Sequence, residues 1–221
     1  PQRPNFSSDS PLRIISTNAA MAIGTTIGAR AQVPSPTGAI DGRFSVATDK
    51  QVYFSQGNLQ CNNPNNAATR TWAFAEHQYD RIGTANLQNT EIGVILGSTI
   101  DLFGWSANNT TAPFGISLSQ DAADYAGDFV DWGTNAITNG GNQPNLWRTL
   151  SQAEWIYLFS GRPNANSLYS WATVNNINGI VVLPDAFVCP STVTFTPKST
   201  NTYTITEWET MEQAGAVFLP T

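Results

Sequence analysis

Leu150-Ser-Gln-Ala-Glu-Trp155 is the stretch that decides most about the fold, because it marks the start of a helix. Ser151 and Glu154 have the spacing of a capping box, in which each side chain accepts a hydrogen bond from the other residue's backbone N–H. The leucine and the tryptophan at the two ends have the spacing of a hydrophobic staple. Apolar residues then recur at helical spacing until Gly161, which is typical of a C-cap. We therefore expect a helix from Ser151 to Gly161.

A second capping box, Thr206-Glu-Trp-Glu209, predicts another helix, which carries Trp208 on its apolar stripe and ends before Gly215. Gly179–Leu183 is an apolar run that follows the first helix and ends in a proline, and Ala216–Leu219 follows the second helix in the same way. Short apolar runs bounded by turn residues are typical of buried strands. The unit of helix, loop, apolar strand and Leu-Pro thus occurs twice.

The part of the sequence before these helices has the patterns of short strands. Phe44–Ala47 and Gln51–Gln56 are separated by Asp-Lys and predict a hairpin. Arg70–Ala75 predicts a further strand with Trp72 and Phe74 on one face, after a polar insert rich in turn residues. Short strands, two helices and long ordered loops together predict an α+β fold.

Residues 80–141 are rich in Gly and Asn and have few periodic runs. Long irregular segments of this kind are usually functional loops or disorder. Aromatic residues occur along this one at a density that favours ordered loops pinned onto a core. The expected anchors are Phe103, Trp105, Phe114, Tyr125, Phe129 and Trp132.

Residues 1–43 differ from the remainder, residues 44–221, which we expect to form one domain. The first segment has prolines near both ends, an apolar run of small residues and no clean strand or helix period. Because such a segment can hardly form a core of its own, we expect either an extended N-terminal arm, used for attachment or oligomerisation, or a flexible linker.

The composition argues against several classes of function. Only 12% of the residues are charged and the net charge is −6, so the protein repels phosphate and we expect no nucleic-acid partner. No run approaches the roughly 18 apolar residues of a membrane helix, so we expect no membrane insertion. With His77 as the single histidine and only Cys61 and Cys189 as cysteines, a zinc site is excluded. The two cysteines are either unrelated thiols or one long-range disulfide.

Candidate catalytic and metal-binding residues are few. His77 follows a strand and is more typical of a hydrogen-bonded loop residue than of a catalytic base, so we expect no enzymatic activity. Four aspartates at spacings of three and four form either a solvated face or a calcium site, and we otherwise expect no cofactor. These are Asp121, Asp124, Asp128 and Asp131. Gln143-Pro-Asn145 matches a short sugar-binding signature of calcium-dependent lectins, but we interpret it as a turn leading into Trp147.

Two known families resemble parts of the sequence. Trp147–Trp155 is similar to the Arg-Leu-Pro-Thr-x-Ala-Glu-Trp segment of the formylglycine-generating sulfatase-modifying family, whose fold is a decorated C-type lectin-like domain. A larger set of motifs resembles the variable proteins of diversity-generating retroelements, which occur in gut Bacteroidales such as Bacteroides and in their phages. These motifs are Val52–Leu59, Trp72–Asp80, Ile100–Trp105, Asp131–Asn135 and Ala214–Pro220, so the resemblance runs from about residue 42 to the end.

The resemblance implies a C-type lectin-like domain that displays a hypervariable ligand-binding surface. In that family the variable residues follow a segment that here ends at Pro220, so we expect this domain to lack its C-terminal variable segment. No binding residue of the family can therefore be carried over. Cys61 and Cys189 do not have the late positions of the cysteines that sulfatase-modifying enzymes use, so similarity of fold does not imply that activity.

The leading hypothesis is a non-enzymatic ligand-binding or display protein on a phage virion or an extracellular bacterial surface, with a role in receptor recognition or adhesion. Its expected partners are a host surface protein or glycan, other virion or surface subunits through the arm, and further copies of itself. The alternatives are a structural virion fibre or decoration protein and, from another class, a formylglycine-type or glycan-acting enzyme. Four aromatic residues are expected to anchor the domain: Trp147, Trp155, Trp208 and Phe218.

Overall fold

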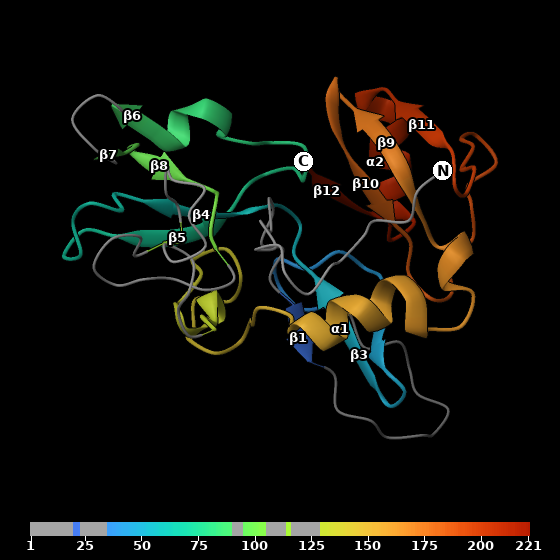
Figure 1. The fold of residues 1–221 in the computed structure, drawn as a ribbon, viewed down its shortest axis with the longest axis horizontal. Helices are drawn as coiled ribbons and strands as arrows, with labels where there is room; N and C mark the ends of the chain where they lie inside the picture. The colour runs from blue at the N-terminus through green and yellow to red at the C-terminus, as the bar shows by residue number, and fades with distance from the viewer. Residues whose placement is uncertain (1–19, 23–34, 90–94, 105–113, 116–128) are drawn as a thin grey trace.

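The described residues form a mixed α+β fold with four small sheets and two α-helices (Figure 1). The structure is a computed structural model, and it describes residues 20–22, 35–89, 95–104, 114–115 and 129–221. The elements gather into three groups, and their buried apolar side chains form three clusters, two of which include residues of the four-stranded sheet. The expected α+β class is confirmed. Within these residues no helix is long and apolar enough to cross a membrane.

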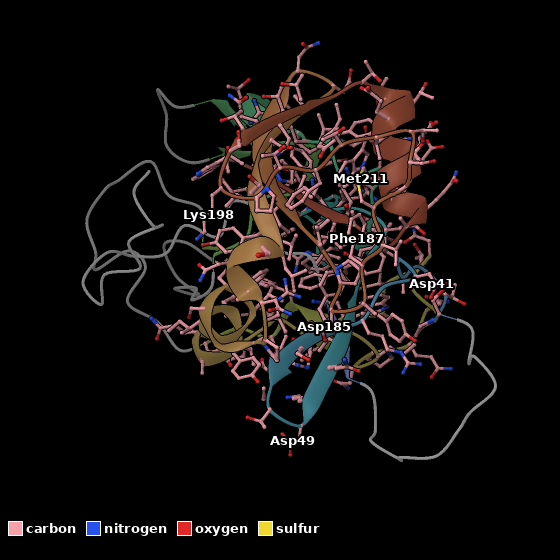
Figure 2. The ribbon with its side chains drawn as sticks, turned by 90° about the vertical axis from the view of Figure 1, so that its right-hand side faces the viewer. Asp41, Asp49, Asp185, Phe187, Lys198 and Met211 are labelled. Atoms are coloured by element: carbon pink, nitrogen blue, oxygen red, sulfur yellow. The ribbon has the colours of Figure 1, made fainter. Side chains whose placement is uncertain are left out.

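The first group is a three-stranded sheet covered by the first helix (Figure 1). Its strands are β1 (Ala20–Ala22), β2 (Phe44–Ala47) and β3 (Lys50–Phe54), in the order β1-β3-β2. The predicted hairpin is confirmed, because β2 and β3 pair antiparallel, and Figure 2 shows Asp49 at its tip. α1 (Gln152–Ile156) continues directly as a π-helical turn (Tyr157–Gly161), so the predicted helix from Ser151 to Gly161 is also confirmed.

The second group is a four-stranded sheet with a helix on one face. Its strands are β9 (Tyr169–Val174), β10 (Ile177–Val182), β11 (Thr200–Tyr203) and β12 (Val217–Pro220), in the order β11-β9-β10-β12. Both apolar runs predicted as strands are confirmed as β10 and β12, which pair antiparallel. α2 (Ile205–Gln213) packs Trp208 and Met211 against this sheet, and Figure 2 shows Met211 on the side of α2 that faces the strands.

The predicted capping box of α2 is wrong by two residues. The N-cap is Thr204 rather than Thr206, and Glu207 completes the box. A capping box that starts at Thr204 and one that starts at Thr206 both fit the Ser/Thr-x-x-Glu pattern, and the hydrophobic staple decides between these two frames. With Thr204 as N-cap, Tyr203 and Trp208 occupy the two staple positions, and their ring centres lie 6.1 Å apart. In the other frame one staple position falls on a threonine, which has little apolar surface to bury.

The third group consists of a three-stranded and a two-stranded sheet. The strands are β4 (Leu59–Asn62), β5 (Thr71–Phe74), β6 (Leu87–Asn89), β7 (Ile95–Leu96) and β8 (Thr99–Ile100), paired as β5-β4-β8 and β6-β7. The polar insert forms turns between β4 and β5, as predicted. Of the expected loop anchors, Phe103, Phe114 and Trp132 are buried, whereas Phe129 is 41% exposed. Trp105 and Tyr125 lie outside the described residues.

The described part of the expected N-terminal arm lies along the domain itself. β1 pairs antiparallel with β3. Ile40 donates its N–H to the carbonyl of Phe54 at 2.9 Å, and its side chain belongs to the core cluster shared by β2, β3 and α1. The last residues of the segment 1–43 thus contribute to the domain core, while the role of the segment in attachment or oligomerisation stays a prediction.

Gln78, which follows β5 of the third group, joins the end of β3 in the first group to β12 in the second. Its side chain is fully buried, and its Nε2 donates to the carbonyl of Ser55 at 3.1 Å. Its Oε1 accepts a hydrogen bond from the N–H of Phe218 on β12 at 2.6 Å. Asn58 in turn donates to the carbonyl of Gln78. A buried amide with both ends satisfied fixes the groups that it joins, because breaking either bond leaves a buried polar atom unpaired.

Candidate functional site

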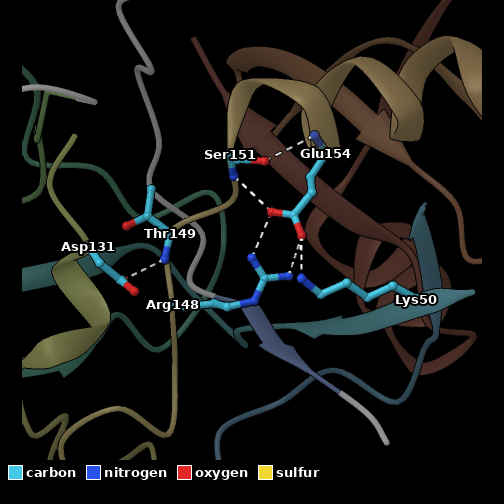
Figure 3. A network of polar contacts seen from close by, with 6 residues as sticks. All are labelled: Lys50, Asp131, Arg148, Thr149, Ser151 and Glu154. Carbon is cyan, nitrogen blue, oxygen red and sulfur yellow. Dashed lines mark hydrogen bonds and ion pairs between the residues drawn. The ribbon is translucent and has the colours of Figure 1, made fainter. Parts of the chain in front are cut away.

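Glu154 is the centre of a charged cluster that ties the start of α1 to the residues before it (Figure 3). Arg148 donates two hydrogen bonds to the carboxylate, at 2.7 and 2.8 Å, and Lys50 donates a third at 2.8 Å. The backbone N–H of Ser151 donates a fourth at 2.9 Å. Burial alone would raise the pKa of Glu154, but these hydrogen bonds outweigh it and lower the pKa to about 2. The carboxylate is therefore charged at neutral pH and fixes residues 148–154.

Residues 131–149 form a loop whose two ends are joined by Asp131. Its Oδ1 accepts hydrogen bonds from the backbone N–H of Gly133 at 3.0 Å and of Thr149 at 2.8 Å (Figure 3). The Thr149 hydroxyl accepts from the N–H of Trp132 at 3.1 Å. A Cβ on Gly133 would lie 1.9 Å from the carbonyl oxygen of Trp147, so only glycine fits there. The 131–149 loop is therefore closed and tightly packed at its base.

The middle of the 131–149 loop is attached to the free edge of β5. Asn139 acts as a strand would: its Oδ1 accepts from the N–H of Phe74 at 2.7 Å, and its Nδ2 donates to the carbonyl of Phe74 at 2.9 Å. Thr138 donates from its N–H and its hydroxyl to the carbonyl of Trp72, at 2.9 and 3.0 Å. The loop is thus held beside β5 by hydrogen bonds to the strand's backbone, which makes it a fixed wall.

A polar hollow of about 400 Å³ lies between the 131–149 loop and the start of β5. Its lining residues come from the insert before β5, from β5 and from the loop. They are Ala67, Arg70, Thr71, Trp72, Asn135, Ala136, Thr138 and Asn142. Arg70 is the charged residue among them, and the other polar side chains, apart from the indole, are amides and hydroxyls. The hollow therefore offers neutral hydrogen-bonding groups around one positive charge.

Arg70 is held in place from two sides. Its Nη2 donates to the carbonyl of Pro64 at 2.6 Å, and the guanidinium carbon lies 5.0 Å from the centre of the Phe114 ring, within cation–π range. Its Nε is buried and has no hydrogen-bond partner among the described residues. In the same part of the chain it forms no ion pair, unlike Arg148 and Arg162.

An aromatic cluster supports the hollow from behind. Trp72, Phe103, Phe114 and Trp132 are all buried, and their ring centres lie between 5.2 and 6.3 Å apart. The indole N–H of Trp132 donates to the carbonyl of Gly104 at 2.9 Å. Rings packed at these distances contribute beyond the area that they bury. The wall of the hollow thus rests on a rigid part of the core.

The four expected anchors differ in burial. Trp147 and Trp208 are fully buried, as is Phe218, which packs on Trp208 with ring centres 5.6 Å apart. Trp155 is only half-buried and packs against Phe54 and Phe159 at the edge of its cluster. Trp147 alone among the four supports the 131–149 loop, because its indole N–H donates to the carbonyl of Gly140 at 2.8 Å.

Of the four aspartates considered for calcium, Asp131 is the one that lies in the described residues. Asp131 serves as the cap and clamp of the 131–149 loop, and Asp121, Asp124 and Asp128 lie outside the described residues. The predicted turn at Gln143-Pro-Asn145 is confirmed, with Asn145 at φ 64° and its side chain exposed. In the described ranges no three His, Cys, Asp or Glu side chains are grouped as metal ligands would be.

The residues considered for catalysis are engaged elsewhere. The ring of His77 stacks on Tyr79 with ring centres 4.9 Å apart, and its Nε2 lies 4.0 Å from a carboxylate oxygen of Glu76. Cys61 and Cys189 are both free thiols, the first buried and the second exposed. Burial raises the pKa of Cys61 to about 12, although the nearby Arg70 acts in the opposite direction. The Cys61 thiol is therefore protonated at neutral pH and is no nucleophile.

Sequence reasoning missed the residues that build the hollow. The sequence predicts Arg70 only as the start of a strand and indicates no role for Asn139. A local signal existed for Arg70: a lone cation in a stretch of otherwise uncharged residues. None existed for Asn139, because its role depends on the edge of a strand 65 residues away.

Comparisons with protein-family models, with curated proteins and with solved structures found no significant match to this chain.

Proposed function

We propose that this chain is a non-enzymatic ligand-binding or display protein with a C-type lectin-like domain, akin to the variable proteins of diversity-generating retroelements. Its expected place is a phage virion or a bacterial cell surface, where it contributes to receptor recognition or adhesion. The motif resemblance supports the class of protein, and the polar, weakly charged composition suits recognition through neutral hydrogen bonds.

The hollow beside β5 is the observation that carries this proposal. Its polar groups sit on backbone that the rest of the fold has already fixed, through Asn139 at the strand edge and Asp131 at the base of the loop. Binding sites need such preorganised support, because an ordered site loses less conformational freedom when the ligand arrives. Burial in a cleft together with a few convergent polar groups is the usual form of a small-ligand site.

The test fills the hollow without touching the core. Ala136 is exposed and lines the hollow, so Ala136→Trp should block it while the domain stays folded. Ala186→Trp is the matched control, because Ala186 is also exposed but does not line the hollow. The protein and both variants are applied to a glycan array and to intact Bacteroides cells. We expect binding by the parent and the control and a loss of binding by Ala136→Trp. Equal binding by all three would exclude the hollow, and no binding by the parent would favour a structural virion protein.

A further inference from the structure

We infer that the hollow recognises an acidic saccharide, with the carboxylate of a uronic acid paired to Arg70 and the sugar hydroxyls bonded to the neutral groups around it. This inference rests on the proposed function and adds the class of ligand. Its starting point is the incomplete set of partners around Arg70.

The other arginines of the described chain that are held away from water have carboxylate partners. Arg148 pairs with Glu154 at 2.7 Å, and Arg162 pairs with Asp185 at 3.1 Å. Arg43 and Arg81 are exposed, and they donate to the Tyr53 hydroxyl at 3.2 Å and to the carbonyl of Thr221 at 2.8 Å. Arg70 is half-buried, packs over the Phe114 ring and has one carbonyl as its hydrogen-bond partner in the described residues. A partly desolvated cation without an anion is unfavourable unless something else supplies the charge.

The unsatisfied donor of Arg70 adds a second observation. Its Nε–H is buried and has no acceptor in the described part of the chain. Buried donors are satisfied in the great majority of native structures. The Nε of Arg148 lacks an acceptor as well, but the Arg148 guanidinium has the Glu154 carboxylate as a partner, so Arg70 differs from it in lacking an anion among the described residues. An oxyanion in the hollow would supply that missing charge. Arginine is well suited to this role, because its planar fork matches the two oxygens of a carboxylate.

The remaining lining residues decide which kind of anion fits. Among the described lining residues none besides Arg70 is charged, so the hollow is suited to a single negative charge rather than to a phosphate, which carries nearly two. The overall charge of −6 disfavours polyanions further. The side chains of Thr71 and Asn142 make no hydrogen bond to other described residues, and both line the hollow. Free hydroxyl and amide groups beside one cation match a ligand that carries many hydroxyls and one carboxylate.

The experiment compares acidic and neutral forms of the same sugars. Oligosaccharides that carry a single terminal uronic acid are arrayed beside their carboxyl-reduced counterparts, and the best pair is measured by isothermal titration calorimetry. We expect the acidic member to bind more tightly, and Arg70→Gln to weaken it by roughly tenfold or more, well beyond its effect on the neutral member. Arg81→Gln is the control, because it changes the net charge equally at an exposed position outside the hollow.

A second variant keeps the test independent of the folding of Arg70→Gln. Asn142→Asp places a carboxylate at the exposed edge of the hollow, where φ is 51° and aspartate is well tolerated. It should weaken binding of the acidic sugar much more than binding of the neutral one. If Ala136→Trp abolishes binding but no acidic sugar binds better than its reduced counterpart, the carboxylate inference is wrong and the proposed function stands. If Ala136→Trp has no effect on any ligand, both are wrong. Preferential binding of an acidic peptide such as oligoglutamate would overturn the saccharide class.

Discussion

Replacing Glu154 by Gln should remove most of what the charged cluster at the start of α1 contributes to stability. The carboxylate accepts four hydrogen bonds, from Arg148, Lys50 and the backbone of Ser151. Although burial acts in the opposite direction, these bonds lower its pKa from 4.5 to about 2. Each pKa unit corresponds to about 1.4 kcal/mol, so the cluster contributes on the order of 3 kcal/mol at neutral pH.

The same shift fixes the direction of the pH dependence. Because the pKa of Glu154 is lower in the folded state, the unfolded chain binds the proton more tightly. The contribution is therefore fully present above about pH 4.5 and is lost as the pH falls toward 2. Urea unfolding at a series of pH values should show this loss in the parent. Glu154→Gln should be less stable by about 2–4 kcal/mol at pH 7, and its stability should vary less with pH below 4.5.

Glu207 provides the matched control, because it has the same position in the capping box of α2. It accepts hydrogen bonds from the N–H and the hydroxyl of Thr204 at 2.8 and 2.9 Å, and no ion pair among the described residues involves it. Glu207→Gln thus removes the same charge and the same cap contact. The difference between the two variants measures what Arg148 and Lys50 add. Equal losses of stability would refute the role assigned to the charged cluster.

Three further predictions follow from burial. Burial raises the pKa of Glu212 from 4.5 to about 7, so folding stability should fall as the pH rises through that range. Glu212→Gln should therefore be more stable than the parent at pH 8 by about 1–2 kcal/mol, after allowance for the partial exposure of the side chain. A more stable parent in urea unfolding at pH 8 would contradict this. Trp208→Ala should lower the free energy of unfolding by about 3–5 kcal/mol, whereas Trp155→Ala should lower it by only about 1–3 kcal/mol, because Trp155 is half-buried. Equal losses in denaturant unfolding would show that this difference in burial is unimportant. A chain that starts at residue 35 should melt close to the full chain. A chain that starts at residue 44 lacks the buried Ile40 and should melt roughly 5–15 °C lower. Equal melting temperatures for these two truncated chains would place the domain boundary at residue 43.

The elements that could be predicted from the sequence are those whose signals are local. The helix that starts at Ser151 has its cap, its staple and its apolar stripe within eleven residues, and it forms where expected. α2 also forms, but two overlapping frames satisfy the same cap pattern. The choice between them depends on how Tyr203 and Trp208 pack together on the sheet, which the pattern alone does not contain.

The hollow could not be predicted because it is assembled from two segments far apart in the sequence. Arg70 comes from the start of β5, and Asn135 and Asn142 come from the 131–149 loop. What brings them together is the pairing of Asn139 with the backbone of Phe74, in which a side chain takes the place of a strand. Side chains that bond to backbone in this way produce no periodic pattern in the sequence. The side chain of Gln78, which bonds to the backbone at the end of β3 and on β12, could not be predicted for the same reason.

Apart from Thr138, which does both, the residues that hold the 131–149 loop differ from those that line the hollow. The holding contacts are hydrogen bonds and close packing that involve backbone groups: those of the half-buried Asp131 carboxylate, the backbone of Gly133 against Trp147, and the exposed Asn139 at the edge of β5. The lining side chains of Thr71, Ala136 and Asn142 are exposed and make none of these contacts. Substitutions at exposed positions without such contacts usually change stability by no more than about 0.5 kcal/mol, whereas loss of a hydrogen bond to the backbone costs about 0.5–1.5 kcal/mol. The chemistry of the hollow can therefore change while its frame stays intact, which is what a protein that displays a recognition surface requires.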